Sequence, residues 1–503
     1  MNENKQLVIN MAASFIAYAV TLGINFFLSP YIVEHIGVEA YGFVGLANNF
    51  ISYASLITIA LNSLAGRFVT VKIYEKDMEG ANRYFSSVFI ANIIITAFMG
   101  LLAAIVLIYL ERLIQIPANI FWDVKILFAA LFANCLIGTV TSVYTIATFA
   151  TNKLYLNSMR QIESNVIRAV LTIFLFLVLV PRVCYIGITS LITGVYVVIF
   201  NIYYTKKLLP EIQIRRKFFD VKAVWDLVSS GVWNLVTRLG QLLLDGVDLL
   251  ITNLFINATA MGVLSLAKIV PAAITGIIGN LAGIFSPNFT ILYAEKKKEE
   301  LLAAVKQSMK IMGIITNLPI VILIVCGSQF FSLWQPTQDA LQLQILSVLT
   351  CCGFILSGGI NCIFDIFTVV NKLKLNSILV CLTGVINAIV VYILLQTTNL
   401  GLYAVAGVSS MLSIFKNLTI IIPYGAICMG EKWYTFYSPA LKPVLGTLCS
   451  CVVGFFLKRF VTICGWFELL LMAIVVGIFS IIISFFVILN KNDRRFVLSK
   501  LKR

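Results

Sequence analysis

Residues 84–110 read YFSSVFIANIIITAFMGLLAAIVLIYL and contain no charged side chain. A membrane-spanning helix needs about 20 consecutive, mostly apolar residues, so this stretch predicts one such helix. Stretches of the same kind follow one another along the whole chain and predict an all-α integral membrane protein with about 14 transmembrane helices. The predicted spans are residues 7–33, 40–66, 84–110, 126–150, 164–181, 184–204, 227–254, 259–286, 308–333, 343–370, 377–396, 402–424, 443–462 and 467–489.

The composition excludes the soluble and disordered classes of protein. Of the 503 residues, 60% are hydrophobic and 12% are charged, whereas a soluble domain carries about 25% charged residues. The mean hydropathy is +0.98. No polar stretch reaches the ~50 residues of a small separate domain, and the first apolar segment is too long for a removable signal peptide.

The net charge of +15 is explained by the predicted loops. Cytoplasmic loops of membrane proteins collect Lys and Arg. Placing both termini in the cytoplasm puts 28 of the 37 basic residues inside and five outside, and the other four lie deep within spans. Lys310, Lys458 and Arg459, near the ends of their spans, are counted with the adjacent side. This split predicts a multi-pass protein of the plasma (inner) membrane with both termini cytoplasmic. It also indicates membrane lipids, and not nucleic acid, as partners.

Catalytic and metal-binding chemistry has few candidate residues. The chain has 11 cysteines without metal-ligand spacing and a single histidine, His35, so we predict no metal, no cofactor and no catalytic residue. The predicted outer loops are short, and the longest has about 15 residues near 111–125. A membrane polymerase or glycosyltransferase usually needs a larger outer loop for its acceptor. The sequence therefore predicts a transporter and not an enzyme.

The chain matches itself weakly at an offset of 220 residues. Because both copies fall in and after the second helix of a six-helix half, they enter the membrane from the same side. This pattern predicts a parallel repeat, a common plan of transporters. The matching pairs are Ala40-Tyr41-Gly42 with Ala260-Met261-Gly262, Leu46-Ala47 with Leu266-Ala267, and Glu75-Lys76 with Glu295-Lys296.

A family resemblance starts in the same region. The stretch Gly37-Val38-Glu39-Ala40-Tyr41-Gly42 resembles the motif that follows the first helix of polysaccharide-export flippases. The run from Phe219-Asp220 through Gly231 to Asp248, and then from Gly262 to Ala267, resembles their second half. The resemblance covers about residues 10–425 and points to the multidrug/oligosaccharidyl-lipid/polysaccharide exporter superfamily. It implies two parallel six-helix bundles around a central cavity, two further helices, and the flipping of undecaprenyl-pyrophosphate-linked sugar units such as O-antigen or capsule repeat units.

The repeat and the resemblance divide the chain into five parts. We predict an N-terminal bundle at 1–207, a C-terminal bundle at 227–424 and two last helices within 425–489. A basic amphipathic linker at 208–226 is predicted to lie as an interfacial helix on anionic lipid, and a basic cytoplasmic tail covers 490–503. Recruitment of polysaccharide-assembly proteins is the alternative for the linker.

Ionisable side chains within a span are costly to bury and are candidate functional groups. Amides there can bind sugar hydroxyls, although they also bond neighbouring helices. Arg168 is also predicted to reach the lipid headgroups. Asp365 is also predicted to pair with Lys372 and hold the loop there in place. The predicted substrate-binding residues are Arg238, Lys416, Lys268, Arg168, Asn25, Asn48 and Asn234, and the predicted coupling or charge-pairing acids are Asp245, Asp248 and Asp365.

Asp245 and Lys268 lie equally far from the predicted hairpin tip at 256–257. They predict either a structural salt bridge or a site where Asp245 couples transport to Na⁺ or H⁺. Arg238 has no acid at its mirrored depth. Since a guanidinium grips phosphate oxygens in pairs and keeps its charge, Arg238 is the candidate for the pyrophosphate, with pairing to Asp365 as the alternative.

The leading hypothesis is a flippase for lipid-linked oligosaccharide that works by alternating access. A cation-coupled multidrug exporter of the same superfamily is the second hypothesis. Four bases against three acids within the spans favour an anionic substrate and thus the flippase. A membrane polysaccharide polymerase is the third hypothesis, and the short outer loops, the single histidine and the repeat argue against it.

Overall fold

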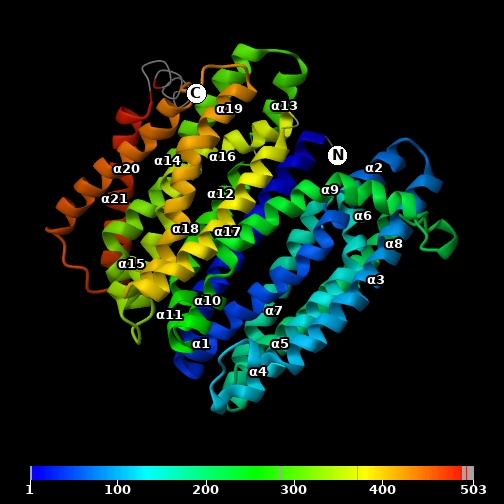
Figure 1. Ribbon diagram of the computed structural model, residues 1–503, viewed down its shortest axis with the longest axis horizontal. Helices are drawn as coiled ribbons and strands as arrows, with labels where there is room; N and C mark the ends of the chain where they lie inside the picture. The colour runs from blue at the N-terminus through cyan, green and yellow to red at the C-terminus, as the bar shows by residue number, and fades with distance from the viewer. Residues whose placement is uncertain (1–2, 283–284, 371, 490–493, 495–503) are drawn as a thin grey trace. The chain divides into compact units, whose positions relative to one another are not determined.

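The computed structural model describes residues 3–282, 285–370, 372–489 and 494, which form helices and turns but no strand (Figure 1). These residues confirm the predicted all-α class. Contacts divide the chain into two compact units. The first unit comprises Met1–Leu242 and Leu249–Gly262, and the second comprises Leu243–Asp248 and Val263–Arg503. The predicted bundle limits stay a prediction, and the tail at 490–503 lies outside the described residues except for Arg494.

In the first unit, α1 packs along α7 and α9, and α5 packs along α8. Two later helices, α10 and α11, cross the division between the units. The helices are α1 (Glu3–Asn62), α2 (Ala65–Tyr74), α3 (Met78–Ile108), α4 (Leu110–Leu113), α5 (Phe121–Thr141), α6 (Ile146–Ala150), α7 (Leu154–Val178), α8 (Cys184–Leu208), α9 (Val221–Gln241), α10 (Asp248–Phe255) and α11 (Ala258–Ala267), with short 3₁₀ turns η1 (Ala118–Ile120), η2 (Ser142–Thr145) and η3 (Arg216–Phe218).

In the second unit, α14 is the central helix and packs against α15, α16, α20 and α21. Two π-helical turns, η4 (Leu242–Gly246) and η5 (Asn417–Ile421), interrupt the regular helices. The helices are α12 (Ile269–Ala282), α13 (Ser286–Ala294), α14 (Lys298–Trp334), α15 (Ala340–Cys351), α16 (Phe354–Val369), α17 (Leu373–Thr397), α18 (Leu402–Lys416), α19 (Ile422–Cys428), α20 (Tyr437–Lys458) and α21 (Trp466–Val487).

The first helix contains two of the predicted spans. At 1.5 Å per residue, the 60 residues of α1 would reach about 90 Å, three times the ~30 Å hydrocarbon core of a bilayer. The helix breaks at Gly37, whose φ of 82° and ψ of 159° are not helical. A residue with a side chain rarely adopts this conformation. Gly37 therefore ends one span and starts the next with no loop between them.

The number of spans agrees with the sequence. Twelve helical stretches of the described residues are long and apolar enough to cross a membrane, and the first of them, Ile9–Tyr74, holds the predicted spans 7–33 and 40–66. The predicted span 227–254 is also helical, as α9, η4 and α10. It is not among the twelve.

The 220-residue repeat recurs in the helix limits. Lys76 and Lys296 occupy the same place in two short turns, and both have positive φ, 60° and 58°. The same offset separates the helices on either side of those turns. The matching limits are the ends of α2 and α13, at Tyr74 and Ala294, and the starts of α3 and α14, at Met78 and Lys298.

The basic linker differs from the prediction. Between α8 and α9 the chain forms no α-helix: it has a turn at 210–211 and the short turn η3, and a helix starts only at Val221. Buried polar side chains of α3 hold this segment: Asn82 Oδ1 accepts from the Gln213 N–H (2.7 Å), and Ser87 Oγ accepts from the Asp220 N–H (2.9 Å). These bonds satisfy backbone groups that a helix would have used. The predicted interfacial helix over 208–226 is therefore wrong for residues 209–220, and residues 221–226 are helical as the start of α9.

Gly42 and Gly262, which the repeat pairs, lie against each other within the first unit. A Cβ on Gly42 would lie 2.7 Å from the Gly262 Cα, and a Cβ on Gly262 would lie 2.2 Å from the Val38 carbonyl oxygen. Small residues allow two helix backbones to approach this closely in a membrane. The contact therefore requires glycine at both positions.

We expect Gly42→Ala to lower the thermal unfolding midpoint and the yield of detergent-purified protein. Because the added methyl meets backbone and not a movable side chain, the loss should be about 1–3 kcal/mol of stability. Gly138→Ala is the matched control, since a Cβ there meets nothing within 4 Å. Equal unfolding midpoints for the two variants would contradict the close approach.

Candidate functional site

The structure distributes the ten candidate residues over both units. The first unit holds five of them, including both arginines, and the second unit holds three acids and two lysines. The residues of the first unit are Asn25, Asn48, Arg168, Asn234 and Arg238, and those of the second are Asp245, Asp248, Lys268, Asp365 and Lys416.

Lys268 is paired within the second unit. Its Nζ lies 2.5 Å from Asp248 Oδ2 and donates to the Asp245 backbone carbonyl at 2.7 Å. Asp248 is only 1% exposed. The predicted salt bridge between Asp245 and Lys268 side chains is thus wrong, because Asp248 is the acid that pairs with Lys268.

The π-helical turn η4 is the physical reason for this difference. The prediction assumed a regular helix from Arg238 to Asp248, but η4 and the bend after it shift the register at Asp245. As a result, Asp245 presents its carbonyl to Lys268, and its carboxylate lies on the exposed side of the turn. Within the described residues that carboxylate makes no ion pair.

Asn387 in α17 also binds this turn. Its Nδ2 donates to the carbonyls of Leu243 at 3.3 Å and Leu244 at 3.1 Å. A π-helical turn leaves such carbonyls without regular partners, and π-helical turns occur often at functional sites. Asn387 was not among the residues predicted from the sequence. An amide within the apolar span 377–396 was the available signal.

Lys416 completes a group of four charges in the second unit. It is 8% exposed, ends α18 where η5 begins, and interacts electrostatically with Asp245. We call Asp245, Asp248, Lys268 and Lys416 the charge cluster. Two acids and two bases compensate one another, which lowers the free energy needed to hold charge within a membrane.

Asp365 in α16 lies apart from these pairs. Its Oδ2 is buried and accepts no hydrogen bond from the described residues. No ion pair joins it to Lys372 there either, so this predicted pairing is not formed. Among the described residues no group of His, Cys, Asp and Glu could hold a metal ion.

In the first unit, Arg168 lies near a buried hydroxyl pair. It interacts electrostatically with Tyr41, whose hydroxyl is 2.7 Å from Ser29 Oγ. The candidate amide side chains make few contacts. Asn25 is exposed, and Asn48 donates to the Val44 carbonyl of its own helix at 3.0 Å. Asn234 donates to Ser63 Oγ at a long 3.5 Å.

Arg238 differs from the lysines of the charge cluster. Its side chain is exposed, and Nη1 donates to Gln241 Oε1 at 3.2 Å. It forms no salt bridge with a described residue of the first unit. The alternative pairing with Asp365, which lies in the second unit, stays a prediction. Its charge is therefore available to a ligand.

A protein-family model described as "Polysaccharide biosynthesis protein" matches residues 7–290, more than half of the chain. The chain belongs to this family. It is also 26% identical over 506 residues to EpsK, an uncharacterized membrane protein of Bacillus subtilis (strain 168), with 99% of this chain and 98% of EpsK aligned. The predicted family resemblance is confirmed.

Solved structures share the fold. The lipid II flippase MurJ in an inward closed conformation matches with a TM-score of 0.67 and 15% identity, over 95% of this chain and 98% of MurJ. An inward-facing multidrug transporter of the MATE family matches with a TM-score of 0.65 and 15% identity, over 84% of this chain and 98% of that transporter. A transporter of the multidrug/oligosaccharidyl-lipid/polysaccharide exporter superfamily from Pyrococcus furiosus matches with a TM-score of 0.62 and 16% identity. The match covers 84% of this chain and 95% of that transporter. These matches confirm the exporter-superfamily fold.

We expect Asp248→Asn to reduce the amount of folded protein strongly. The substitution leaves Lys268 buried without its acid, and breaking a buried pair costs about 3–5 kcal/mol. Asp245→Asn is the matched control. The same change three residues earlier removes no direct ion pair and weakens only the longer-range interactions with Lys416 and Lys268, so the loss of folded protein should be much smaller. Size-exclusion profiles and thermal unfolding of the purified variants check this.

The exchange Asp248→Lys with Lys268→Asp should recover part of the yield. If Asp245→Asn lowers the folded amount as much as Asp248→Asn does, the pairing described above is wrong.

Proposed function

We propose that the protein is a flippase that carries undecaprenyl-pyrophosphate-linked oligosaccharide repeat units across the plasma membrane by alternating access. Its product would serve the synthesis of surface polysaccharide. Membership of a polysaccharide biosynthesis family supports this function. A fold shared with a flippase of lipid II supports it as well. Such transport requires no covalent step and hence no catalytic residue.

The observation that carries the proposal is the exposed guanidinium of Arg238, which forms no ion pair with the described residues of the first unit. A charge within a span costs about 3 kcal/mol or more unless it is compensated. Lys268 pairs with Asp248 and Lys416 interacts with Asp245, whereas Arg238 forms no ion pair with the described residues of its own unit. A pyrophosphate group would supply the missing anion and accept two parallel hydrogen bonds from the guanidinium.

A cation-coupled multidrug exporter is the second candidate, because the fold matches MATE transporters almost as well as MurJ. A cationic drug would bind an acidic surface. The exposed carboxylate of Asp245 favours this reading, while Arg238 opposes it. Transport of lipid-linked oligosaccharide and of cationic dyes by the same purified protein discriminates between the two functions.

We further propose that Asp245 couples transport to a Na⁺ or H⁺ gradient. Its carboxylate is exposed and unpaired, and it interacts electrostatically with Lys416 and Lys268. Binding of a cation or proton to Asp245 would raise the net charge of the charge cluster by +1. Lipid-linked oligosaccharide, membrane lipids and polysaccharide-assembly proteins are the proposed partners.

Arg238→Ala should accumulate and unfold as the wild-type protein does, yet fail to restore surface polysaccharide in a strain that lacks the protein. Since one hydrogen bond to a charged group contributes about 1.5–3 kcal/mol, flipping of lipid-linked oligosaccharide in liposomes should fall about tenfold to a hundredfold. Arg238→Lys should keep part of the activity, because it retains the charge and loses the paired geometry.

Lys222→Ala is the control for this experiment, since Lys222 is an exposed base near the start of the same helix. It should transport normally. A fully active Arg238→Ala protein would remove the assigned role from Arg238.

The proposed orientation is tested by cysteine labelling in a cysteine-free background. Thr337→Cys and Asn399→Cys should react with an impermeant thiol reagent in intact cells, and Lys297→Cys should react only after permeabilisation. All three positions are exposed, so accessibility does not limit labelling. Labelling of Lys297→Cys in intact cells would show that the cytoplasmic placement of both termini is wrong.

A further inference from the structure

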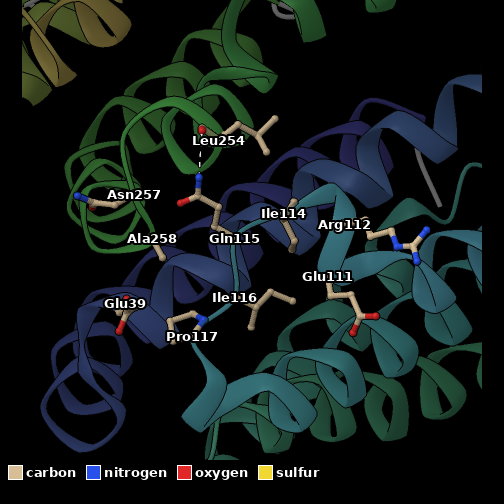
Figure 2. A pocket seen from close by; sticks show the side chains of 10 residues that line it. All are labelled: Glu39, Glu111, Arg112, Ile114, Gln115, Ile116, Pro117, Leu254, Asn257 and Ala258. Atoms are coloured by element: carbon tan, nitrogen blue, oxygen red, sulfur yellow. Dashed lines mark hydrogen bonds between the residues drawn. The ribbon is translucent and has the colours of Figure 1, made fainter.

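A polar pocket of about 590 Å³ lies in the first unit (Figure 2). Three segments surround it: α1 just after the break at Gly37, the loop after α4, and the turn between α10 and α11. Binding pockets for small molecules usually have about 300–1,000 Å³. At about 30 Å³ for each water molecule, this pocket has the volume of roughly 20 waters, which is room for one or two sugar rings.

The wall of the pocket is held in place by a buried amide. Asn253 is fully buried, its Oδ1 accepts from the Gln115 N–H at 2.8 Å, and its Nδ2 donates to the Gln115 carbonyl at 3.0 Å. Gln115 Nε2 in turn donates to the Leu254 carbonyl at 3.2 Å, as Figure 2 shows. These bonds join the loop after α4 to α10. The pocket is therefore formed before any ligand binds, which reduces the ordering cost of binding.

The lining combines groups that suit a carbohydrate. Glu39 and Glu111 offer carboxylate acceptors, Gln115 and Asn257 offer amides, and Arg112 offers donors. Ile114, Ile116, Pro117 and Leu254 add apolar surface for the carbon face of a sugar ring.

The formal charge of the lining is −1, from two acids and one base. An anionic pyrophosphate is therefore a poor ligand for it, in contrast to Arg238.

We propose that this pocket binds the uncharged sugar portion of the transported molecule on the outer side of the membrane. The proposal rests on the proposed function for the identity of the substrate. The outer placement follows from the charge distribution of the loops, which predicts that the turns near 37, 111–117 and 256–257 face outward. Release of the sugars would thus occur through a site separate from the one that holds the pyrophosphate.

The test uses full-length protein purified in nanodiscs. The probe is an oligosaccharide of one or two repeat units, released by mild acid from the surface polysaccharide of the same strain and free of lipid and phosphate. We expect binding by saturation-transfer NMR, and at least tenfold weaker binding to Glu39→Ala and Glu111→Ala. Glu34→Ala is the control, because Glu34 is an exposed acid of the same helix that does not line the pocket. It should bind as the wild type does.

Three outcomes would overturn the proposal. They are no binding by the wild type, equal binding by all variants, and displacement of the oligosaccharide by inorganic pyrophosphate, which would indicate an anion site. Failure of the proposed function looks different: lipid-linked oligosaccharide would not be flipped in liposomes, whether or not the free oligosaccharide binds.

The side of the membrane is tested separately. Gln115→Cys, at an exposed position, should react with an impermeant thiol reagent in intact cells, and added oligosaccharide should slow this reaction at least twofold. Reaction only after permeabilisation would overturn the outer placement.

Discussion

A bilayer interior offers no water to a backbone group or charge that lacks a partner, and the arrangement of the second unit depends on this constraint. The turn η4 breaks the regular hydrogen bonds of a membrane helix, and its carbonyls would be costly to bury alone. Lys268 and Asn387 supply the missing donors. Asp248 then compensates the ammonium that Lys268 brings. The irregular turn η4, the Asn387 amide and the Lys268–Asp248 ion pair thus depend on one another for stability.

This dependence also separates the bases within the spans by role. The charge of Lys268 is used in holding the turn, and Lys416 interacts with the Asp245 carboxylate. A ligand would have to compete with these interactions to bind either lysine. Arg238 has only a neutral amide as its observed partner. The sequence already indicated that Arg238 has no acid at its mirrored depth, and the structure adds that it forms no ion pair with the described residues of the first unit.

Much of the fold could be predicted from the sequence, because span length, apolar composition and loop charge are properties of each segment by itself. The repeat was weak in the amino-acid sequence. It is clearer in the structure, because the ends of α2 and α13 recur at the same offset, as does the positive φ of Lys76 and Lys296. The pairing of Asp248 with Lys268 could not be predicted, since counting from a hairpin tip assumes a regular helix. The non-helical linker was not predicted either, because its partners, Asn82 and Ser87, are more than 100 residues away in the sequence.

The chemistry of a lipid-linked oligosaccharide explains why two unlike sites would be useful to one carrier. The molecule joins a pyrophosphate, which needs a permanent cation within the membrane, to sugars, which need neutral hydrogen-bonding groups and apolar surface. A single strongly basic site would hold the pyrophosphate well and release it slowly, because tighter ground-state binding lengthens residence. The pocket with Glu39 and Glu111 carries a net negative charge and would repel the pyrophosphate while it accepts the sugars. Opposite charge at the two sites would therefore orient the molecule, with its pyrophosphate and its sugars at different sites.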